Sequence, residues 1–517
     1  MGGGRFDAVV VGGGHNGLVA ATLLARAGRT VCLLEAAGQF GGATAGARVF
    51  DGVGARLSRY SYLVSLFPDE LIAELGLDLR LLSRAVASYT PTVRGGRATG
   101  LLVERSPGPA TEQSFRELTG SGQEWAAWCE FYRRVAVFAG VVAPTMLGPL
   151  PRRAGVRAAV ASALGGRVWD DLVERPIGET IEDAFADDLV RGVVATDAQI
   201  GTHASLRDER ANRCFAYHVI GNGTGEWRVP VGGMGALADS LVGAARTAGV
   251  QLRTGARVTA VAEDGDVALV RTEGGDEFAG TWVLGACSPS ILDGLLGRAA
   301  RPAEGSQLKV NMVLRRLPAL RSGIDPRVAF AGTLHLEQGY GQLLEAFTEA
   351  EAGRLPDPLP AEVYCHSLTD PSIVDDDLAG CHTLTLFGLH TPARLFPAET
   401  GAAARRALAT VQAHLAEPLD EVLATDASGR PCVEVATPAD LERKLLMPGG
   451  HIFHADLEWP WLADDEPAET PAQRWGVAVA GCDRVLLAGA GSRRGGGVSG
   501  LGGLHAARAV LEAGGKN

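Results

Sequence analysis

Short apolar runs and helical periodicity alternate at the start of the chain. Residues 8–11 form an apolar, valine-rich run that is typical of a buried strand. Apolar residues between 18 and 25 then recur at the spacing of one helix face, and Gly28 follows where a helix would end. A second apolar run covers residues 30–34. The pattern therefore predicts a strand–helix–strand unit over residues 7–35.

Three glycines and one acid give this unit its chemistry. Gly12, Gly14 and Gly17 form G-x-G-x-x-G between strand and helix, and Glu35 follows the second strand. Gly12 allows a tight turn, Gly14 lets the backbone approach a pyrophosphate, and Gly17 lets helix and strand pack closely. The helix N-terminus directs its amides at the phosphates. Glu35 accepts hydrogen bonds from a ribose 2′-hydroxyl, so the unit predicts a dinucleotide site.

The rest of the pattern predicts a second region inserted into the first. Residues 86–103 are typical of strands, and residues 111–218 are mostly helical. A buried strand at 282–286 has the character of the first sheet, and another near 485 meets a second glycine loop. A chain of 517 residues exceeds what one core usually supports. We therefore expect an α/β fold whose nucleotide-binding domain is interrupted by an α+β substrate domain.

This organisation divides the chain into five segments. The nucleotide-binding domain takes residues 1–85, 226–290 and 481–517. The substrate domain takes residues 86–225, with a helical cap, and residues 291–480. Both glycine loops have the form strand–glycine–helix and lie near opposite ends of the chain. The simplest explanation is one nucleotide site to which both ends of the chain contribute a glycine loop.

Composition narrows the class of protein further. The net charge of -12 argues against a nucleic-acid partner. No apolar run reaches the length of about eighteen residues that a transmembrane helix needs, and the residues before the first strand leave no room for a signal peptide. A cytoplasmic location is expected. The 8 cysteines include no C-x-x-C. The pairs Cys365-His366 and Cys381-His382 are better explained by two core strands than by a metal site, so no metal is expected.

Two features of the helical region have a structural and a functional interpretation. Trp125, Trp128, Phe131 and Val135 recur at helix spacing; a helix core is favoured over a substrate pocket. Four arginines between residues 152 and 167 make a basic, apolar-flanked segment. A solvated helix face is favoured over peripheral contact with a membrane surface.

The whole pattern resembles the phytoene-desaturase-type flavoprotein oxidoreductases, in particular the branch similar to pyridine nucleotide-disulfide oxidoreductase domain protein 2. The resemblance covers nearly the full length and is far more specific than the glycine motif alone. Five segments carry it: DAVVVGGGHNGLVAATLLARAG at 7–28, RLSRYSYLVSLFPDELIAELGL at 56–77, PVGGMGALADSL at 230–241, GGHIFHADLEW at 449–459 and LLAGAGSRRGGGVSGLGGLHAAR at 486–508. Because C-x-x-C is absent, disulfide chemistry is not inferred.

The resemblance implies a non-covalently bound FAD in a Rossmann-type domain of the glutathione-reductase kind. The residues that it places at the diphosphate and the adenosine ribose are Gly12, Gly14, Asn16, Gly17 and Glu35. Those along the diphosphate and ribityl chain are Gly41, Gly42, Ala43 and Thr44, and the backbone of Val258 would meet the adenine. Those near the ribityl chain and isoalloxazine are Gly491, Ser492, Gly497, Val498 and Ser499. Amides at a helix N-terminus there would stabilise negative charge on the reduced flavin.

The chain departs from its relatives at two places in the C-terminal loop. Ser492 stands where many relatives have an acidic residue or threonine, and serine still bonds a ribityl hydroxyl. Arg493 and Arg494 stand where many have His-Pro. Their guanidinium groups would bind an anionic group of the substrate or face water, and we favour water.

The implied chemistry is hydride transfer from a substrate C–H to flavin N5. No second G-x-G-x-x-G lies between residues 85 and 480, which favours oxygen or a quinone over a pyridine nucleotide as electron acceptor. A base would assist some substrates, and histidine suits neutral pH. His218 and His454 are the candidates, each with a structural role as the alternative. His15, beside the phosphate loop, is expected to contact the cofactor.

Three functions remain open at this point. The leading one is an oxidase or dehydrogenase that introduces a double bond into a small, largely apolar molecule. The second is flavin-dependent amine oxidation, for which aromatic side chains near the flavin are expected. The third is a redox-neutral isomerase or a non-catalytic flavoprotein partner.

Overall fold

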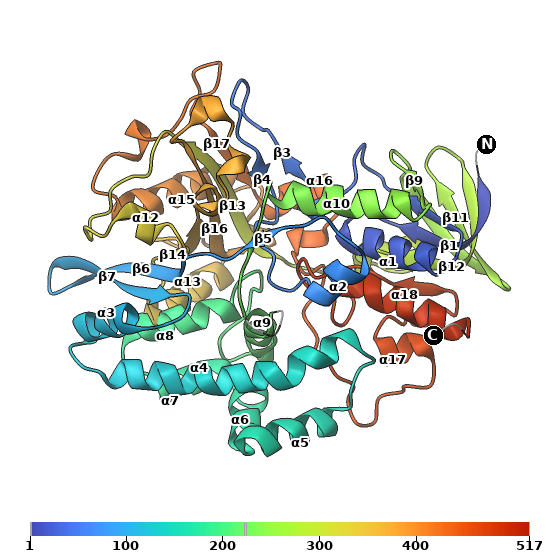
Figure 1. Ribbon diagram of the computed structural model, residues 1–517, viewed down its shortest axis with the longest axis horizontal. Helices are drawn as coiled ribbons and strands as arrows, with labels where there is room; N and C mark the ends of the chain where they lie inside the picture. The colour runs from blue at the N-terminus through green and yellow to red at the C-terminus, as the bar shows by residue number, and fades with distance from the viewer. Residues whose placement is uncertain (1–2, 222, 224, 516–517) are drawn as a thin grey trace.

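Two large sheets and a layer of helices make up the protein. The computed structural model describes residues 3–221, 223 and 225–515. The first sheet and both chain ends lie at the right of Figure 1, and the second sheet lies at the left. The helices of residues 109–220 run along the lower side (Figure 1). The expected mixed α/β architecture with a Rossmann-like domain is confirmed.

The first sheet is assembled from distant parts of the chain. Its strands are β1 (Gly4–Val11), β2 (Val31–Leu34), β9 (Gln251–Arg253), β10 (Val258–Asp264), β11 (Val267–Thr272), β12 (Glu277–Gly285) and β18 (Val485–Leu487). Their order is β10-β11-β12-β1-β2-β9, and β18 pairs with β12. β1 runs parallel to β2 and β12. Ala8, Val9 and Val10 in β1 are completely buried, as expected of a parallel strand covered on both faces.

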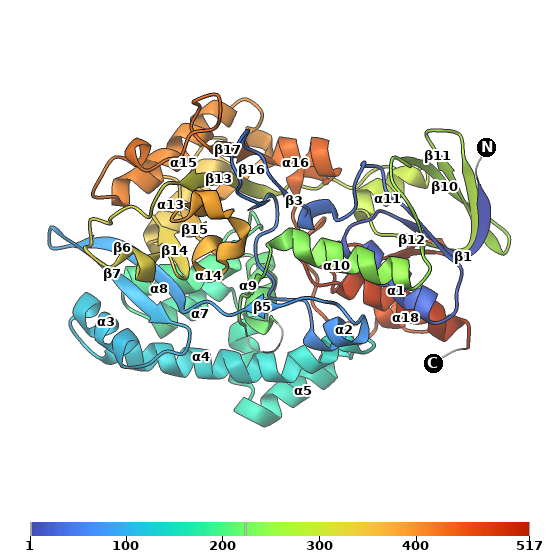
Figure 2. The same ribbon diagram turned by 45° about the horizontal axis from the view of Figure 1, so that its top comes forward.

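Three helices cover one face of this sheet. They are α1 (His15–Arg26), α10 (Met234–Thr247) and α18 (Leu501–Ala513), which lie side by side in Figures 1 and 2. Leu18, Leu237 and Leu504 belong to the apolar core that they share with β1 and β2. The short helices of this region are α2 (Asp69–Glu74), α11 (Pro289–Leu295) and α17 (Pro471–Trp475). The packing brings the first and last helices of the chain into direct contact.

The second sheet has the order β17-β13-β16-β15-β14-β6-β7. Its strands are β6 (Val86–Arg94), β7 (Arg97–Glu104), β13 (Ser306–Leu314), β14 (Thr333–Leu336), β15 (Ala361–Tyr364), β16 (His382–Pro392) and β17 (Val433–Ala436). The helices of these parts of the chain are α12 (Pro326–Ala329), α13 (Tyr340–Glu351), α14 (His366–Thr369), α15 (Thr400–His414) and α16 (Pro438–Leu445). Every residue of β13 is buried. Two short pairs, β3 (Gly46–Ala47) with β4 (Leu57–Ser58) and β5 (Leu81–Leu82) with β8 (Val229–Pro230), join the regions.

The helical layer comprises α3 (Pro109–Thr119), α4 (Gln123–Val142), α5 (Arg153–Leu164), α6 (Arg167–Trp169), α7 (Ile177–Ala184), α8 (Asp188–Ala195) and α9 (Glu209–Ile220). Trp128, Phe131 and Val135 of α4 are buried in its core, so the predicted helix core is confirmed. The basic segment pairs with nearby carboxylates: Arg153 contacts Glu174. Arg157 lies 3.6 Å from Asp170, and Arg167 lies 3.6 Å from Asp171.

The structure also bears on the Cys365-His366 pair, on metal sites and on membrane-spanning helices. β15 ends at Tyr364, Cys365 follows it, and His366 opens α14, so the prediction that this pair lies in a strand is wrong. Among the described residues, no cluster of three or more His, Cys, Asp or Glu has the arrangement of a metal site. Within the same residues, no helix combines the length and apolarity that crossing a membrane requires.

Candidate functional site

The N-terminal glycine loop forms the tight turn that the sequence predicts. Gly12 has φ 108°, and its amide donates to Leu34 O at 2.8 Å. Helix α1 begins at His15 directly after the loop. A Cβ on Gly17 would lie 2.0 Å from Gly12 O, so only glycine permits this approach of helix to loop. A Cβ on Gly14 would meet nothing within 4 Å, which leaves open space in front of the helix N-terminus.

Glu35 lies beside this loop at the end of β2. Its carboxylate accepts the amide hydrogens of Gly13 and Ala37, both at 2.7 Å. Its own amide donates to Arg253 O, and its carbonyl accepts from Ala256. Residues 253–256, which lead into Val258, are therefore bonded to the backbone of Glu35. The resemblance assigns Glu35 to the adenosine ribose. The roles of Glu35 and Val258 toward the nucleotide stay predictions.

The glycine pair at residues 41–42 packs against the first loop. Gly41 donates to Gly13 O at 2.9 Å, and a Cβ on Gly42 would lie 3.3 Å from the Cα of Gly14. Residues 42–44 form a 3-10 turn, in which the Thr44 hydroxyl donates to Gly41 O and the carbonyl of Ala43 accepts from Ser61. The backbones of residues 13–14 and 41–42 are therefore in direct contact, with no side chains between them. A cofactor can approach such a backbone closely.

The C-terminal loop closes on the N-terminal one. A Cβ on Gly503 would lie 2.0 Å from Asn16 O, and the amide of Gly503 donates to Asn16 Oδ1 at 3.3 Å. The side chain of Asn16 therefore holds α18 against α1, a contact that the sequence motif did not reveal. Ser492 and Ser499 are buried within this loop, and Gly497 has φ 65°.

Buried polar atoms without partners test whether these loops fit FAD. Among the described residues, His15 Nε2 and Ser492 Oγ are buried and have no hydrogen-bond partner. Burial lowers the pKa of His15 to about 4, so the ring is neutral at pH 7. Polar atoms of this kind are costly unless a ligand meets them. Together with the open space at Gly14, they fit a bound dinucleotide.

The two histidines proposed as bases lie in different surroundings. His454 is half-buried beside Gly491, with φ 65° and an unpartnered Nδ1, and borders a polar cavity of about 170 Å³. His218 is buried on α9, where its Nδ1 lies 2.8 Å from Cys214 O and its ring stacks on Trp227 at 5.1 Å. Burial lowers the pKa of His218 to about 4 and that of His454 to about 3, so both are neutral. A catalytic role for either stays a prediction.

The expectation that the two adjacent arginines face water is wrong. Arg494 is 1% exposed and donates to the carbonyls of Thr145 at 2.8 Å and Gly148 at 2.6 Å. Burial lowers its pKa to about 9. Arg493 pairs with Glu458 at 2.9 Å and Glu466 at 2.8 Å. The pair anchors the C-terminal loop to neighbouring segments, because buried guanidinium groups need acceptors.

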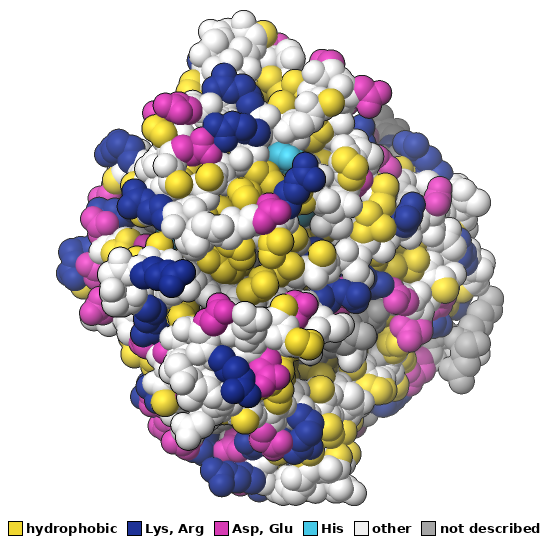
Figure 3. Space-filling view, turned by 60° about the vertical axis from the view of Figure 1, so that its left-hand side comes forward, with side chains coloured by type: hydrophobic (Ala, Val, Ile, Leu, Met, Phe, Trp, Pro, Cys, Tyr) yellow, Lys and Arg dark blue, Asp and Glu magenta, His cyan; other side chains and the backbone are white. Residues whose placement is uncertain are grey.

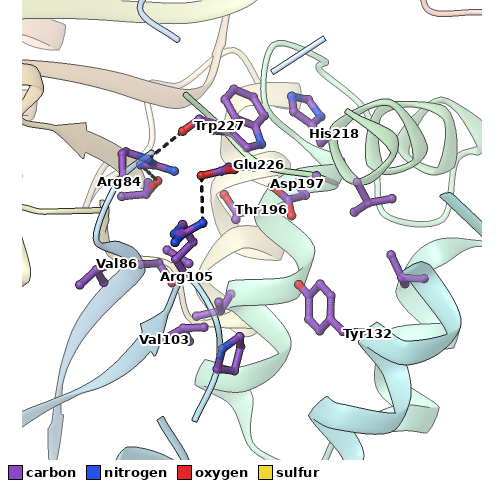
Figure 4. A pocket seen from close by; sticks show the side chains of 18 of the residues that line it. Arg84, Val86, Val103, Arg105, Tyr132, Thr196, Asp197, His218, Glu226 and Trp227 are labelled. Carbon is purple, nitrogen blue, oxygen red and sulfur yellow. Dashed lines mark hydrogen bonds and ion pairs between the residues drawn. The ribbon is translucent and has the colours of Figure 1, made fainter. Parts of the chain in front are cut away.

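A larger cavity of about 400 Å³ lies between the second sheet and the helical layer. Figure 4 shows Val86 and Val103 on one wall, Tyr132 on another, and His218 and Trp227 at the far end. Its aliphatic and aromatic lining and its volume are typical of small-ligand sites. On the face turned forward in Figure 3, hydrophobic side chains gather in a recess with charged side chains around it. Trp128 and Val135 line the cavity too, so the predicted core stripe also contributes to a pocket.

The inner end of this cavity carries charged residues that the sequence analysis missed. Asp197, Glu362 and Arg84 line it, and Figure 4 shows Asp197 beside Thr196 and Glu226. Burial raises the pKa of Glu362. The sequence carried one signal for Asp197 and Glu362: each is a single carboxylate inside an apolar stretch, at residues 193–200 and 361–364. Acids are rarely buried without a partner or a function.

A chain of contacts joins the cavity to the C-terminal loop. The ring of His218, at the cavity wall, lies 6.3 Å from that of Phe453. A Cβ on Gly496 would lie 3.5 Å from Phe453 and 3.6 Å from Tyr217. The hydroxyl of Tyr217 donates to Arg493 O at 2.7 Å. Side-chain contacts through His218, Phe453 and Tyr217 therefore link the cavity wall to the loop.

Family models match two parts of the chain. Residues 10–70 match the NAD(P)-binding Rossmann-like domain, which covers the first glycine loop and Glu35. Residues 155–347 match the flavin-containing amine oxidoreductases and include His218 and Asp197. An uncharacterised protein of Mycobacterium tuberculosis is 47% identical over 98% of this chain and 97% of its own length. The mouse pyridine nucleotide-disulfide oxidoreductase domain-containing protein 2 is 28% identical over 98% of this chain and 93% of its own.

Solved structures share the fold at low identity. Putrescine oxidase bound to putrescine superposes with a TM-score of 0.57 at 16% identity, covering 99% of both chains. Cyclohexylamine oxidase from Brevibacterium oxydans gives 0.52 at 14% identity, over 99% of this chain and 100% of that one. The fold, the loops and the family match agree on the cofactor. The chain belongs to the same family as the mycobacterial protein, one of flavin amine-oxidase-type oxidoreductases, and its cofactor is FAD.

Proposed function

We propose that the protein oxidises a small amine with an apolar body, by removing hydride from the carbon next to the nitrogen. The observation that carries this proposal is the position of the 400 Å³ cavity, whose wall residue His218 lies 6.3 Å from Phe453, a neighbour of the loop at Gly496. Two features favour an amine: the aromatic side chains along the cavity, and the carboxylates at its inner end. The family match over residues 155–347 points the same way.

Different residues of the chain make different contributions to such a reaction. When bound, FAD supplies the hydride acceptor at N5. The aliphatic side chains of α4 and β7 exclude water and align the apolar body of the substrate. The neutral rings of His15 and His218 add no positive charge at the site, so a cationic substrate is not repelled. The glycine loops and Glu35 position the cofactor.

Dehydrogenation of a carbon–carbon bond is the second candidate. The aliphatic wall formed by Val86, Val103 and Val135 favours it, since a hydrocarbon substrate needs no charged partner. The cavity volume of about 400 Å³ suits a small molecule in either case. For reoxidation we propose oxygen or a quinone.

Anaerobic mixing of the purified holoprotein with small amines and their hydrocarbon analogues tests the proposal. Loss of the oxidised-flavin absorbance with amines alone supports amine oxidation, and loss with hydrocarbons supports desaturation. Persistent absorbance together with product formation would mean isomerisation. Unchanged absorbance and no product with any compound would contradict both amine oxidation and dehydrogenation. Ala136→Trp, at the exposed edge of the cavity, should slow reduction, whereas Ala126→Trp, exposed on the same helix outside it, should not.

A further inference from the structure

The two carboxylates at the inner end of the cavity differ in their bonding. Glu362 is 1% exposed, and its oxygens accept from the hydroxyls of Thr196, at 3.0 Å, and Tyr364. Asp197 lines the same cavity, and among the described residues its carboxylate has no hydrogen-bond or ion-pair partner. Leaving a buried carboxylate without a partner is costly. The position of Asp197 is therefore best explained by a ligand that it binds.

Among the residues that the structure describes, none of the charged groups around Asp197 forms a hydrogen bond or ion pair with its carboxylate. The guanidinium of Arg84 donates to Trp227 O at 3.2 Å and to Thr333 Oγ1 at 2.9 Å, and its charge lowers the pKa of Asp197 only in part. Burial, followed by the charge of Glu362, raises that pKa to about 7. The other titratable or charged groups that face this end are Tyr132 on α4, Cys214 and His218 on α9, His335 on β14, and Glu226 with its partner Arg105 at 3.6 Å.

We propose that Asp197 binds the protonated nitrogen of the substrate and so selects amines over neutral molecules of the same shape. The ammonium group then passes one proton to this carboxylate, and the free amine is the form that loses hydride. The proposal rests on the proposed function and names the residue that sets its specificity. An ammonium group donates hydrogen bonds that an unpartnered carboxylate accepts, and such charge-assisted bonds are strong at a buried position such as that of Asp197. The apolar body of the amine then lies against Val103, on the wall labelled in Figure 4, and against Val135, which also lines the cavity.

The test uses a cation that binds without being oxidised. In 2-phenylpropan-2-amine the carbon next to nitrogen carries no hydrogen, and 2-phenylpropan-2-ol is its neutral isostere. Calorimetry on the holoprotein at pH 8 should show the amine binding about 10-fold tighter than the alcohol, the size expected of a charge-assisted hydrogen bond. Asp197→Asn should abolish this preference and leave alcohol binding unchanged. Asp266→Asn, which removes the same charge from a fully exposed turn, should retain it.

The pH profile separates recognition by Asp197 from a structural effect. Amine affinity should rise between pH 6 and pH 8 as Asp197 ionises, and should be flat in Asp197→Asn. Glu362→Gln removes the neighbouring charge and should move the midpoint to lower pH. Equal binding of amine and alcohol by the wild type, no binding of either, or a preference that survives Asp197→Asn would overturn the proposal. If benzylamine still bleaches the flavin in those cases, the proposed function stands without this assignment. If no amine bleaches it, the proposed function fails separately.

Discussion

At the scale of single residues, the protein keeps several polar groups in positions that lower its own stability. His15 Nε2, Ser492 Oγ and His454 Nδ1 are buried without partners among the described residues, and Asp197 is an unpaired carboxylate beside a cavity. Unpaired buried groups of this kind concentrate at binding sites, where a ligand satisfies them. The pattern therefore separates residues that serve ligands from residues such as Glu362, whose partners are built into the fold.

Asp197→Asn should stabilise the ligand-free protein, and more so at high pH. The pKa of Asp197 is raised in the folded state, from 3.8 to about 7. An acid with a raised pKa contributes stability that is present below pH 4 and lost as the pH rises through 7. The thermal midpoint of the variant should exceed that of the wild type by roughly 2 °C or more at pH 8.5. The difference should shrink at pH 5.5, and a constant difference would contradict the assignment.

Gly14→Asp should yield folded protein that lacks FAD. A Cβ at this position meets no protein atom within 4 Å, so the fold should tolerate the substitution, but a carboxylate there enters the predicted diphosphate path. Absorbance of the purified protein measures cofactor content, and circular dichroism checks folding. Gly38→Asp is the matched control, since that glycine is exposed and equally unhindered. Normal flavin content in Gly14→Asp would refute the placement of the diphosphate.

At the scale of elements, the site depends on how closely α1 and α18 approach. The two helices meet at the backbone, with the Asn16 side chain bonded to Gly503. Arg494 ties the loop that precedes α18 to the turn after α4. His505 ties α18 itself to the same turn, because its Nε2 lies 2.8 Å from Met146 O. These contacts join the helical layer to the C-terminal glycine loop and to α18.

Gly503→Ala should separate these helices and weaken FAD binding. The added methyl would lie 2.0 Å from Asn16 O, a backbone atom that cannot move without shifting α1. We expect a loss of about 2 kcal/mol or more in unfolding free energy, together with lower flavin occupancy. Gly243→Ala, on an exposed face of α10 with no atom within 4 Å, should instead stabilise by about 0.5–1 kcal/mol. Denaturant titrations of both variants make the comparison, and similar effects would argue against the close-packing role.

At the scale of the whole molecule, the sequence predicted local units better than it predicted long-range contacts. The first strand–helix–strand unit and the strands at 86–103 follow from periodicity and glycine spacing, which are local properties. The burial of Arg494 could not be predicted from local patterns, because the carbonyl groups that accept its hydrogen bonds lie some 350 positions earlier, at residues 145–148. The cavity was missed for the same reason: Arg84, Asp197 and Glu362 come from three separate parts of the chain. The boundaries at residues 85, 225, 290 and 480, the glutathione-reductase-type description and the individual FAD contacts stay predictions.

Added FAD should raise the thermal midpoint of the whole protein in a single transition. The predicted contacts come from residues 12–17, 35–44, 258 and 491–499, so the cofactor would join segments that lie far apart in sequence and bind only the folded chain. Binding to the folded state alone stabilises by about 2.7 kcal/mol when free FAD exceeds its Kd 100-fold. Protein stripped of flavin should therefore unfold at a lower temperature, and graded additions of FAD should shift the midpoint continuously upward. In Gly14→Asp the midpoint should not respond to FAD, which separates binding at this site from non-specific effects. A midpoint of wild-type protein that ignored FAD would mean that the two ends of the chain close without the cofactor's help.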